Sequence, residues 1–529
     1  MATEPVLIAG EWRQPSKPAG SFNAVDPSTG KALPESYPVS GKDDVEAAFR
    51  AAEDAAVALR TISVDAIGRF LDDYAARIEA AADALCDRAA RETGLAREPR
   101  LRNVELPRTT GQLRQGAAAA RDRSWSQATI DTKANLRSYY AALGGPVVVF
   151  GPNNFPFAFN SVAGGDFVAA IAAGNPVIGK ANTGHPGTSK LLAELAAEAA
   201  RATGLPPGMV QLVYRTLPEV GYALVSDPRV AATGFTGSKS AGLKLKEAAD
   251  RAGKPIYLEM SSTNPVFVLP RALDERGDAI AKELYDSCAM GAGQFCTRPG
   301  LAIVPKGEGG AKFVASLTAH FKGGTPGTLL GPSGATAIAA GLKELTDNGA
   351  RVVVGGSPVA GDRAAFQPTL LEVSAATFLQ KPHELQTEAF GTVNTVIVAD
   401  DVAQMVAVAA ALEGNLTGCV YSDTTGKDDA DYARLSPVLR PKVGRLLNDK
   451  MPTGVAVSPA MNHGGPYPAT GHPGFTAVGI PASLLRFAAL RSFDAVRPHR
   501  LPPELANKNP TGKMWRLIDG NWSQQDITG

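Results

Sequence analysis

The stretch from Met290 to Gly300 carries a residue type and a setting that suit nucleophilic chemistry. Cys296 lies in the run Gly-Ala-Gly-Gln-Phe-Cys-Thr-Arg-Pro-Gly, where small residues let a ligand reach a thiol. The alternative is a small buried hydrophobe, which is the usual fate of a free cysteine. Cys288 lies eight positions upstream, which is not the spacing of a CxxC metal or redox pair. The rest of the chain must therefore supply what a reactive thiolate needs.

Two other polar side chains come at or just after the ends of predicted strands. Glu259 closes the apolar run 256–259, where a partly desolvated carboxylate is placed as a general base. Asn154 follows the run 147–150, where its amide could donate to a developing oxyanion, although Asn-Asn between prolines is also an ordinary turn. The 6 histidines show no HExxH motif or close pairing, so we expect no metal site.

Short apolar strands alternate with helices around these residues. The expected strands are 147–150, 177–180, 210–214, 231–235 and 256–259, and the expected helices are 162–173, 189–202, 220–225 and 239–251. This order predicts a doubly wound parallel sheet, which binds nucleotides at the carboxyl ends of its strands. A second α/β region follows from 265 to about 454. The segment 101–121 is expected to be helical, with its arginines facing solvent.

Two segments at the strand ends are candidates for contact with a nucleotide. Phe235-Thr236-Gly237-Ser238 follows a predicted strand and opens a predicted helix, where free N–H groups can hold a phosphate. It lacks the GxGxxG pattern, so a plain strand-to-helix turn is equally consistent with it. Lys180 ends another strand and could bond ribose hydroxyls, with a surface lysine as the alternative.

Composition narrows the class of protein. The chain has 529 residues, and its 53 Lys and Arg against 52 Asp and Glu give a net charge of +1, so no overall field favours nucleic acid or an anionic membrane. The first residues lack the pattern of a signal peptide, and no apolar run is long enough to span a bilayer. We therefore expect a cytoplasmic enzyme of two to four domains.

Taken together, these motifs resemble those of the aldehyde dehydrogenase superfamily, in the family's order and over most of the chain. They are Gly151-Pro152-Asn153-Asn154-Phe155-Pro156, Gly179-Lys180, Gly234-Phe235-Thr236-Gly237-Ser238, Leu258-Glu259-Met260, Gly293-Gln294-Phe295-Cys296 and Glu388-Ala389-Phe390-Gly391. The resemblance implies that Cys296 attacks an aldehyde, that Asn154 stabilises the oxyanion, and that Glu259 activates the water that hydrolyses a thioester. It implies no metal.

The resemblance also assigns the cofactor contacts. Glu388 would hold the nicotinamide ribose with Phe390 packed nearby, and Lys180 would bind the adenosine ribose. The pyrophosphate would meet the segment with Gly234, Gly237 and Ser238.

The cofactor expected from these residues is NADP, with NAD as the alternative. Members that prefer NAD often carry a glutamate three residues after the lysine, and this chain has Thr183 there. Arg215, after the strand 210–214, could meet a 2′-phosphate, although an exposed loop arginine is the other reading.

Three blocks resemble the α-ketoglutarate-semialdehyde (2,5-dioxopentanoate) dehydrogenases, namely 153–160, 184–189 and 463–470. That substrate carries a carboxylate, for which Arg298 is the candidate clamp and Asn160 a second polar contact. The same blocks are similar to those of bacterial NADP-dependent fatty-aldehyde dehydrogenases. Phe157 and Phe159 could line an apolar channel for a longer aldehyde, which keeps that alternative open.

We expect three parts. Residues 1–125 and 144–259 form the NAD(P)-binding domain, 260–460 form an α/β catalytic domain, and 126–143 with 461–529 form a β bridging element and tail. In the family that arm pairs with a neighbouring subunit, which predicts a homodimer or homotetramer. The retained Cys296, Asn154 and Glu259 argue against a non-catalytic protein of this fold, and Glu259 disfavours an acyltransferase.

Overall fold

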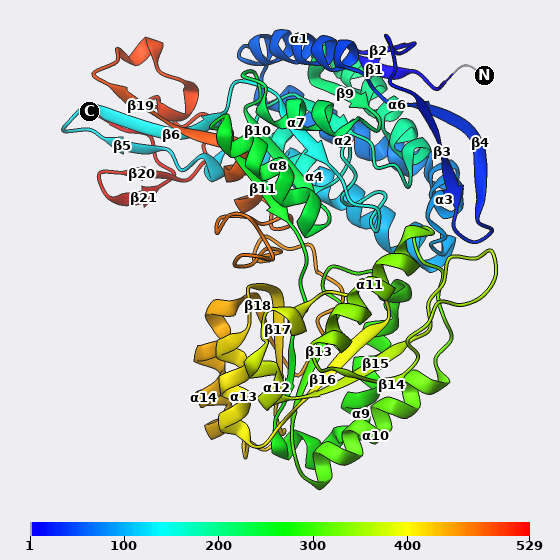
Figure 1. Ribbon diagram of the computed structural model, residues 1–529. Coiled ribbons are helices and arrows are strands. Elements are labelled where there is room, and N and C mark those ends of the chain that lie inside the picture. Colours follow the sequence, from blue (N-terminus) through cyan, green and yellow to red (C-terminus); the bar gives the residue numbers. More distant parts are fainter. Residues whose placement is uncertain (1–2, 529) are drawn as a thin grey trace.

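A computed structural model describes residues 3–528 of the chain. Figure 1 shows two α/β bodies, one above the other, with a β arm projecting from the side of the upper body. No helix within residues 3–528 is long and apolar enough to cross a membrane. The active-site candidates named above come from both bodies, so the way these bodies meet decides the site.

The upper body is built on a seven-stranded sheet in the order β11-β10-β7-β8-β9-β1-β2. Its parallel strands are β7 (Val147–Phe150), β8 (Val177–Lys180), β9 (Val210–Val213), β10 (Ala232–Thr236) and β11 (Ile256–Glu259), and β1 (Val6–Ile8) and β2 (Glu11–Arg13) extend it antiparallel. Helices on both faces bury the central strands, which explains their continuous apolar runs. The register pairs Thr236 with Glu259 and Phe150 with Lys180, so four strand ends meet at one edge.

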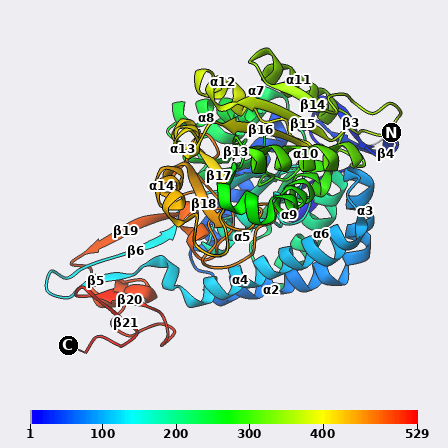
Figure 2. The ribbon, with the colours of Figure 1, turned by 90° about the horizontal axis from the view of Figure 1, so that it is seen from below.

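Helices cover this sheet. They are α1 (Lys42–Leu59), α2 (Val64–Ala80), α3 (Ala82–Thr93), α4 (Leu106–Asp122), α5 (Gly165–Ala172), α6 (Pro186–Thr203), α7 (Pro218–Ser226) and α8 (Lys239–Arg251). Ser63 caps α2 by accepting a hydrogen bond from the N–H of Ala66, as expected of a serine at this position. Figure 2 shows α2 and α4 side by side along the body, where they are in contact.

The lower body has a second seven-stranded sheet in the order β14-β15-β16-β13-β12-β17-β18. Its strands are β12 (Val266–Val268), β13 (Leu301–Pro305), β14 (Arg351–Val354), β15 (Thr369–Ser374), β16 (Val393–Ala399), β17 (Asn415–Tyr421) and β18 (Val443–Asn448). The helices around it are α9 (Pro270–Ala289), α10 (Glu308–Gly323), α11 (Ser333–Asp347), α12 (Ala375–Gln380), α13 (Val402–Ala411) and α14 (Asp429–Leu439). Its buried side chains form cores separate from that of the upper body.

The arm is a five-stranded sheet in the order β19-β6-β5-β20-β21. It joins β5 (Thr129–Asp131) and β6 (Leu136–Ala142) to the tail strands β19 (Ala488–Asp494), β20 (Arg516–Ile518) and β21 (Asn521–Ser523). A separate hairpin pairs β3 (Ser21–Asp26) with β4 (Lys31–Pro38). The two parallel-rich sheets and the small β element confirm the fold class expected from the sequence, whereas the exact domain bounds stay a prediction.

Candidate active site

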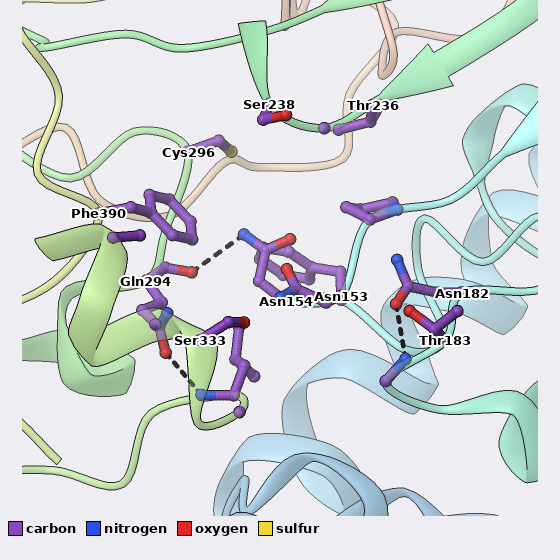
Figure 3. Close-up of a pocket in the computed structure, with 18 of the residues that line it drawn as sticks. Asn153, Asn154, Asn182, Thr183, Thr236, Ser238, Gln294, Cys296, Ser333 and Phe390 are labelled. Carbon is purple, nitrogen blue, oxygen red and sulfur yellow. Dashed lines mark hydrogen bonds between the residues drawn. The ribbon is translucent and has the colours of Figure 1, made fainter. Parts of the chain in front are cut away.

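A cavity of about 680 Å³ opens where the strand ends of the upper sheet face the lower body. The residues predicted from the sequence that line it are Asn154, Thr183, Gly237, Ser238, Glu259, Cys296, Glu388 and Phe390. Figure 3 shows Cys296 and Phe390 on one side of this cavity, facing Asn154, Thr183 and Ser238 from the upper sheet. The structure thus brings the proposed nucleophile, amide and carboxylates into one space.

The thiol lies just after a tight backbone turn. Gly291, Ala292 and Gly293 have φ values of +59°, +56° and +73°, which turn the chain sharply before Cys296. A Cβ on Gly293 would lie 2.1 Å from the carbonyl carbon of Gly391, so only glycine allows this close approach. The loop is therefore fixed against the segment that carries Glu388 and Phe390.

Amide side chains hold the thiol loop from two directions. Asn264 donates from Nδ2 to the carbonyl oxygens of Cys296 and Arg298, at 2.9 Å each. The Gln294 side-chain oxygen accepts from the N–H of Leu330 at 2.8 Å. These bonds fix the backbone on both sides of the nucleophile and limit where Sγ can lie.

Cys296, His463 and Glu259 form a chain of contacts. The Nε2 atom of His463 lies 3.5 Å from Cys296 Sγ and 3.0 Å from Glu259 Oε1. His463 and Glu259 are each only 2% exposed, so their interaction is shielded from solvent. The other carboxylate oxygen of Glu259, Oε2, is buried and has no partner within residues 3–528.

The electrostatic setting favours the protonated thiol. Burial and the Glu259 carboxylate raise the pKa of the Cys296 thiol well above its ordinary value, and Arg108 partly opposes this rise. The thiol therefore keeps its proton at neutral pH until a neighbouring base accepts it. Glu259, with His463 beside it, is placed to do so, since a carboxylate oxygen of Glu259, the Cys296 sulfur and a His463 ring nitrogen lie within 4.8 Å of one another.

Asn154 faces the thiol loop from the upper sheet. Its Nδ2 donates to the Gln294 carbonyl oxygen at 3.0 Å, shown as a dashed line in Figure 3. An amide NH₂ has two hydrogens, so one remains for an oxyanion formed at Cys296. The loop of Asn154 is anchored by the buried Glu105 carboxylate, which accepts from the N–H groups of Phe157 and Ala158 at 2.8 and 3.0 Å.

Glu388 is a partly buried carboxyl at the cofactor side of the cavity. Burial raises its pKa to about 7, against the opposing effects of Arg298 and of hydrogen bonds from Ser261 and Ser262. This environment suits a group that bonds to hydroxyls, because it binds them whether or not it is ionised.

The structure does not place Arg298 where the expected contact with the substrate would need it. Its guanidinium is buried and donates to the backbone carbonyls of Val393, Pro299 and Ala389. The side chain is not among those that line the cavity. Arg298 thus stabilises the backbone beside the thiol loop and Glu388, a role that its position two residues after the cysteine does not reveal.

Asn160 and Phe157 also lie away from the cavity. Asn160 donates to the Pro156 carbonyl at 2.9 Å and to Ser189 Oγ at 3.0 Å, so its amide holds the turn together. Phe157 is 1% exposed and packs in the core of the upper body. The turn instead points Phe155 and Phe159 into the cavity, which corrects the assignment of Phe157.

The cofactor candidates divide into two groups. Ser238 lines the cavity and caps α8, accepting from the N–H of Ala241 at 3.3 Å, and the first turn of α8 holds no acidic residue. Lys180 and Arg215 lie near the ends of β8 and β9 but are not among the lining residues. Burial and Arg215 lower the pKa of Lys180 to about 8.

Gly234 has a packing role that its place in the motif does not reveal. A Cβ there would lie 2.6 Å from Oδ2 of Asp166, whose other oxygen accepts from Arg486 at 2.8 Å. Gly234 is buried within β10 and does not line the cavity, so the expected pyrophosphate contact is not supported by its position. Gly237, one residue beyond β10, does line it.

His463 is the main residue that the sequence reasoning did not assign. It lies 167 positions from Cys296 in a glycine- and proline-rich coil. The block 463–470 supported the family resemblance, but the sequence offered no reason to assign His463 a chemical role. With His463 in place, three side chains that could bind a metal ion lie together. One ligand atom each of Glu259, Cys296 and His463 lies within 4.8 Å of the other two. The expectation of no metal stays a prediction.

Comparison with known proteins gives a consistent result. A family model described as "Aldehyde dehydrogenase family" matches residues 12–434. "Alpha-ketoglutaric semialdehyde dehydrogenase 2" of Azospirillum brasilense is 40% identical over 515 residues, covering 95% of this chain and 96% of that protein. "Alpha-ketoglutaric semialdehyde dehydrogenase" of Acinetobacter baylyi is 36% identical over 496 residues, covering 91% and 92%.

Solved structures share the fold at lower identity. Lactaldehyde dehydrogenase from Escherichia coli superposes with a TM-score of 0.78 at 23% identity, covering 93% of this chain and 98% of that one. A mutant of aldehyde dehydrogenase C from Pseudomonas syringae, solved in complex with NAD+ and octanal, has a TM-score of 0.78 at 20% identity, covering 94% and 98%. At these identities the likeness concerns the fold alone.

Proposed function

This chain belongs to the aldehyde dehydrogenase family, and on that premise we propose that it oxidises α-ketoglutarate semialdehyde (2,5-dioxopentanoate) to 2-oxoglutarate with NADP+. The substrate rests on one observation above all. Two relatives that bear this substrate in their names match more than nine-tenths of the chain, at 40% and 36% identity. Aldehyde oxidation itself follows from the family.

The residues of the cavity supply each protein-based step. Glu259 accepts the proton of the Cys296 thiol, and the thiolate attacks the aldehyde carbon to form a thiohemiacetal. The free N–H of the Asn154 amide donates to the oxyanion. After oxidation, Cys296 carries a thioester. Glu259 passes the thiol proton to solvent and, held by His463, then takes a proton from water. The hydroxide attacks the thioester carbon, the acid leaves, and Glu259 returns this proton to the Cys296 thiolate.

NADP+ supplies the oxidising equivalents when bound, and the described residues fit such a group. Gly237 and Ser238 present the start of α8 to a pyrophosphate, and Glu388 with Phe390 faces a ribose and its base. We assign Lys180 and Thr183 to the adenosine ribose. Two cations, Lys180 and Arg215, and the absence of a carboxylate at Thr183 support a 2′-phosphate.

A second candidate function is the oxidation of longer aliphatic aldehydes. Phe155 and Phe159 line the cavity, and Phe155 packs edge to face on both Phe159 and Phe295, at 5.2 and 5.3 Å between ring centroids. Aromatic side chains of this kind can pack against the long apolar chain of an aliphatic aldehyde as well as against the short chain of the oxo-acid. The choice between the two functions therefore depends on whether a charged group recognises the far end of the substrate.

We also propose that the β arm joins two copies of the chain in a homodimer or homotetramer. Large apolar side chains are exposed on the arm and tail, with Leu490 and Trp522 each 57% exposed and Trp515 48% exposed. Light scattering after gel filtration tests this proposal, and a monomer at micromolar concentration would contradict it.

The reaction is tested by following NADPH and product together. The wild-type protein should form NADPH and 2-oxoglutarate in equal amounts from α-ketoglutarate semialdehyde. The Cys296→Ser variant should form neither, because its hydroxyl is a much weaker nucleophile. Equal activity of that variant, or NADPH without the acid product, would contradict the proposed function.

A further inference from the structure

Arg108 is a partly buried cation without a matching anion. It lies near the start of α4, in the segment whose arginines were expected to face solvent, and for Arg108 that expectation is wrong. Its Nε donates to Gln112 Oε1 at 3.3 Å and its Nη1 to the Val455 carbonyl at 3.2 Å. Its Nη2 is buried and has no hydrogen-bond partner within residues 3–528. A buried N–H left unpaired is costly, and the cost is heavier for a charged group, so the site calls for an acceptor.

The contrast with Arg100 sharpens this point. Both guanidinium groups lie close to the ring of Phe155, at 4.5 Å for Arg100 and 5.6 Å for Arg108. Arg100 is neutralised by the buried Glu105 carboxylate and also donates to the Asn154 carbonyl at 3.0 Å. Arg108 forms no ion pair with any residue from 3 to 528. Its charge is therefore unpaired within residues 3–528, although the side chain lies behind the residues that line the cavity and is not one of them.

Arg108 lies directly behind the aromatic wall of the catalytic cavity. Its guanidinium carbon is 5.2 Å from the ring centroid of Phe159, and Phe159 lines the cavity together with Cys296. The Phe159 ring is in turn 5.8 Å from the His463 ring. One phenylalanine thus separates the unpaired cation from the residues that carry out the chemistry.

We infer that Arg108 binds the carboxylate of the substrate, with Nη2 as the donor and Phe155 and Phe159 flanking the carbon chain. This inference rests on the proposed function and names the residue that selects an anionic aldehyde. It takes the place of Arg298, whose Nη1 and Nη2 atoms both donate to backbone carbonyls. Arginine suits the task because its planar fork matches a carboxylate.

The substrate that Arg108 would hold is short. Four carbon–carbon bonds separate the aldehyde carbon from the carboxylate carbon of 2,5-dioxopentanoate, an extended length of about 5 Å. Arg108 lies 5.2 Å from the ring centroid of Phe159, which lines the cavity with Cys296, and its charge opposes the rise in the pKa of the thiol. In a water-poor cavity such an attraction is stronger than at the surface.

The decisive experiment compares a charged and an uncharged substrate of five carbons. In Arg108→Met, kcat/KM for α-ketoglutarate semialdehyde should fall about 10- to 150-fold, mainly through KM, as for a lost charge-assisted hydrogen bond. Pentanal has no carboxylate, so its kcat/KM should change far less. Arg108→Lys, which keeps the charge and loses the fork, should give an intermediate value. Arg114→Met, on the exposed side of the same helix and paired with Glu79, is the matched control.

Alkylation of Cys296 gives a readout that does not depend on the natural substrate. Iodoacetate carries a carboxylate and iodoacetamide does not, so Arg108→Met should slow alkylation by iodoacetate selectively. Equal slowing by both reagents, or equal loss with both aldehydes, would mean that Arg108 acts on the thiol or the fold and would overturn the inference. If Arg108→Met keeps the wild-type preference for the oxo-acid over pentanal, the inference is also overturned.

The two proposals fail in different ways. If the wild type does not prefer the oxo-acid to pentanal, the proposed function fails, and the alkylation ratio still decides whether Arg108 attracts an anion to the thiol. If the wild type prefers the oxo-acid and Arg108→Met retains that preference, the proposed function stands and the role of Arg108 is refuted.

Discussion

The contact between His463 and Glu259 predicts a large effect from a residue far from the nucleophile in sequence. The change is His463→Ala. It removes the imidazole 3.0 Å from Glu259 Oε1, and Glu259 Oε2 already lacks a partner within residues 3–528. Hydrogen bonds to a buried charged group contribute about 1.5 to 3 kcal/mol. We therefore expect kcat to fall about 10- to 150-fold, because Glu259 is no longer held where it activates water.

The assay is the steady-state rate of NADPH formation at saturating substrate and cofactor. His463→Gln places an amide N–H near the lost Nε2 and should recover most of the rate if the imidazole only holds Glu259. If His463→Gln is as slow as His463→Ala, the imidazole itself transfers a proton. His472→Ala is the matched control, because His472 lies in the same coil but is exposed.

A kcat for His463→Ala within about twofold of the wild type would refute the reasoning, since the loss of a buried charge-assisted hydrogen bond cannot be so small. Thermal unfolding of each variant separates this outcome from a loss of folded protein. A Tm a few degrees below the wild-type value is expected, because the imidazole is buried and its contact with Glu259 is lost.

Three further predictions follow from single positions. Gly293→Ala should abolish activity and lower stability by about 1 to 3 kcal/mol, as measured by denaturant unfolding, because its Cβ would lie 2.1 Å from the Gly391 carbonyl carbon. Lys180 has a pKa lowered to about 8, so its ammonium is charged below that pH and neutral above it. The KM for NADP+ should therefore rise several-fold from about pH 7 to about pH 9, and the KM for NAD+ should rise far less. Equal rises in the two KM values would contradict a contact between Lys180 and the 2′-phosphate. Cys288 is fully buried, so iodoacetamide should label Cys296 alone in peptide mapping, and Cys288→Ser should keep kcat within about twofold.

Much of the fold follows from local patterns in the sequence. The helix expected at 239–251 has the bounds of α8 because its signals are local, with Ser238 as the cap. The strands of the upper sheet were found from short apolar runs for the same reason. The arm also followed, since β5 and β6 lie within residues 126–143, where a β bridging element was expected.

The site was predictable where strand topology determines it. Glu259 and Asn154 were found because the carboxyl ends of parallel strands meet at one edge, and Cys296 because small residues surround it. Asn160 and Phe157 were misplaced because a turn, unlike a strand, does not reveal which of its side chains faces inwards. Phe155 and Phe159 face the cavity instead.

The remaining residues depend on tertiary packing and leave no local signal. His463 reaches Cys296 across 167 positions, through a coil with no periodicity. Arg108 is one of three arginines on α4, and no pattern distinguishes the one whose Nη2 atom is buried and unpaired among the described residues from the other two. Arg298 was assigned to the substrate carboxylate because it is close to the nucleophile in sequence. That closeness does not imply that its side chain points into the cavity.

The central claim is that this enzyme selects an anionic oxo-acid semialdehyde. The most direct test is the ratio of kcat/KM for α-ketoglutarate semialdehyde to that for hexanal, at saturating NADP+. We predict a ratio above about 100, which corresponds to roughly 2.7 kcal/mol of discrimination in the transition state. A ratio near or below one would contradict the claim. It would instead support the second candidate function, the oxidation of aliphatic aldehydes that pack against Phe155 and Phe159.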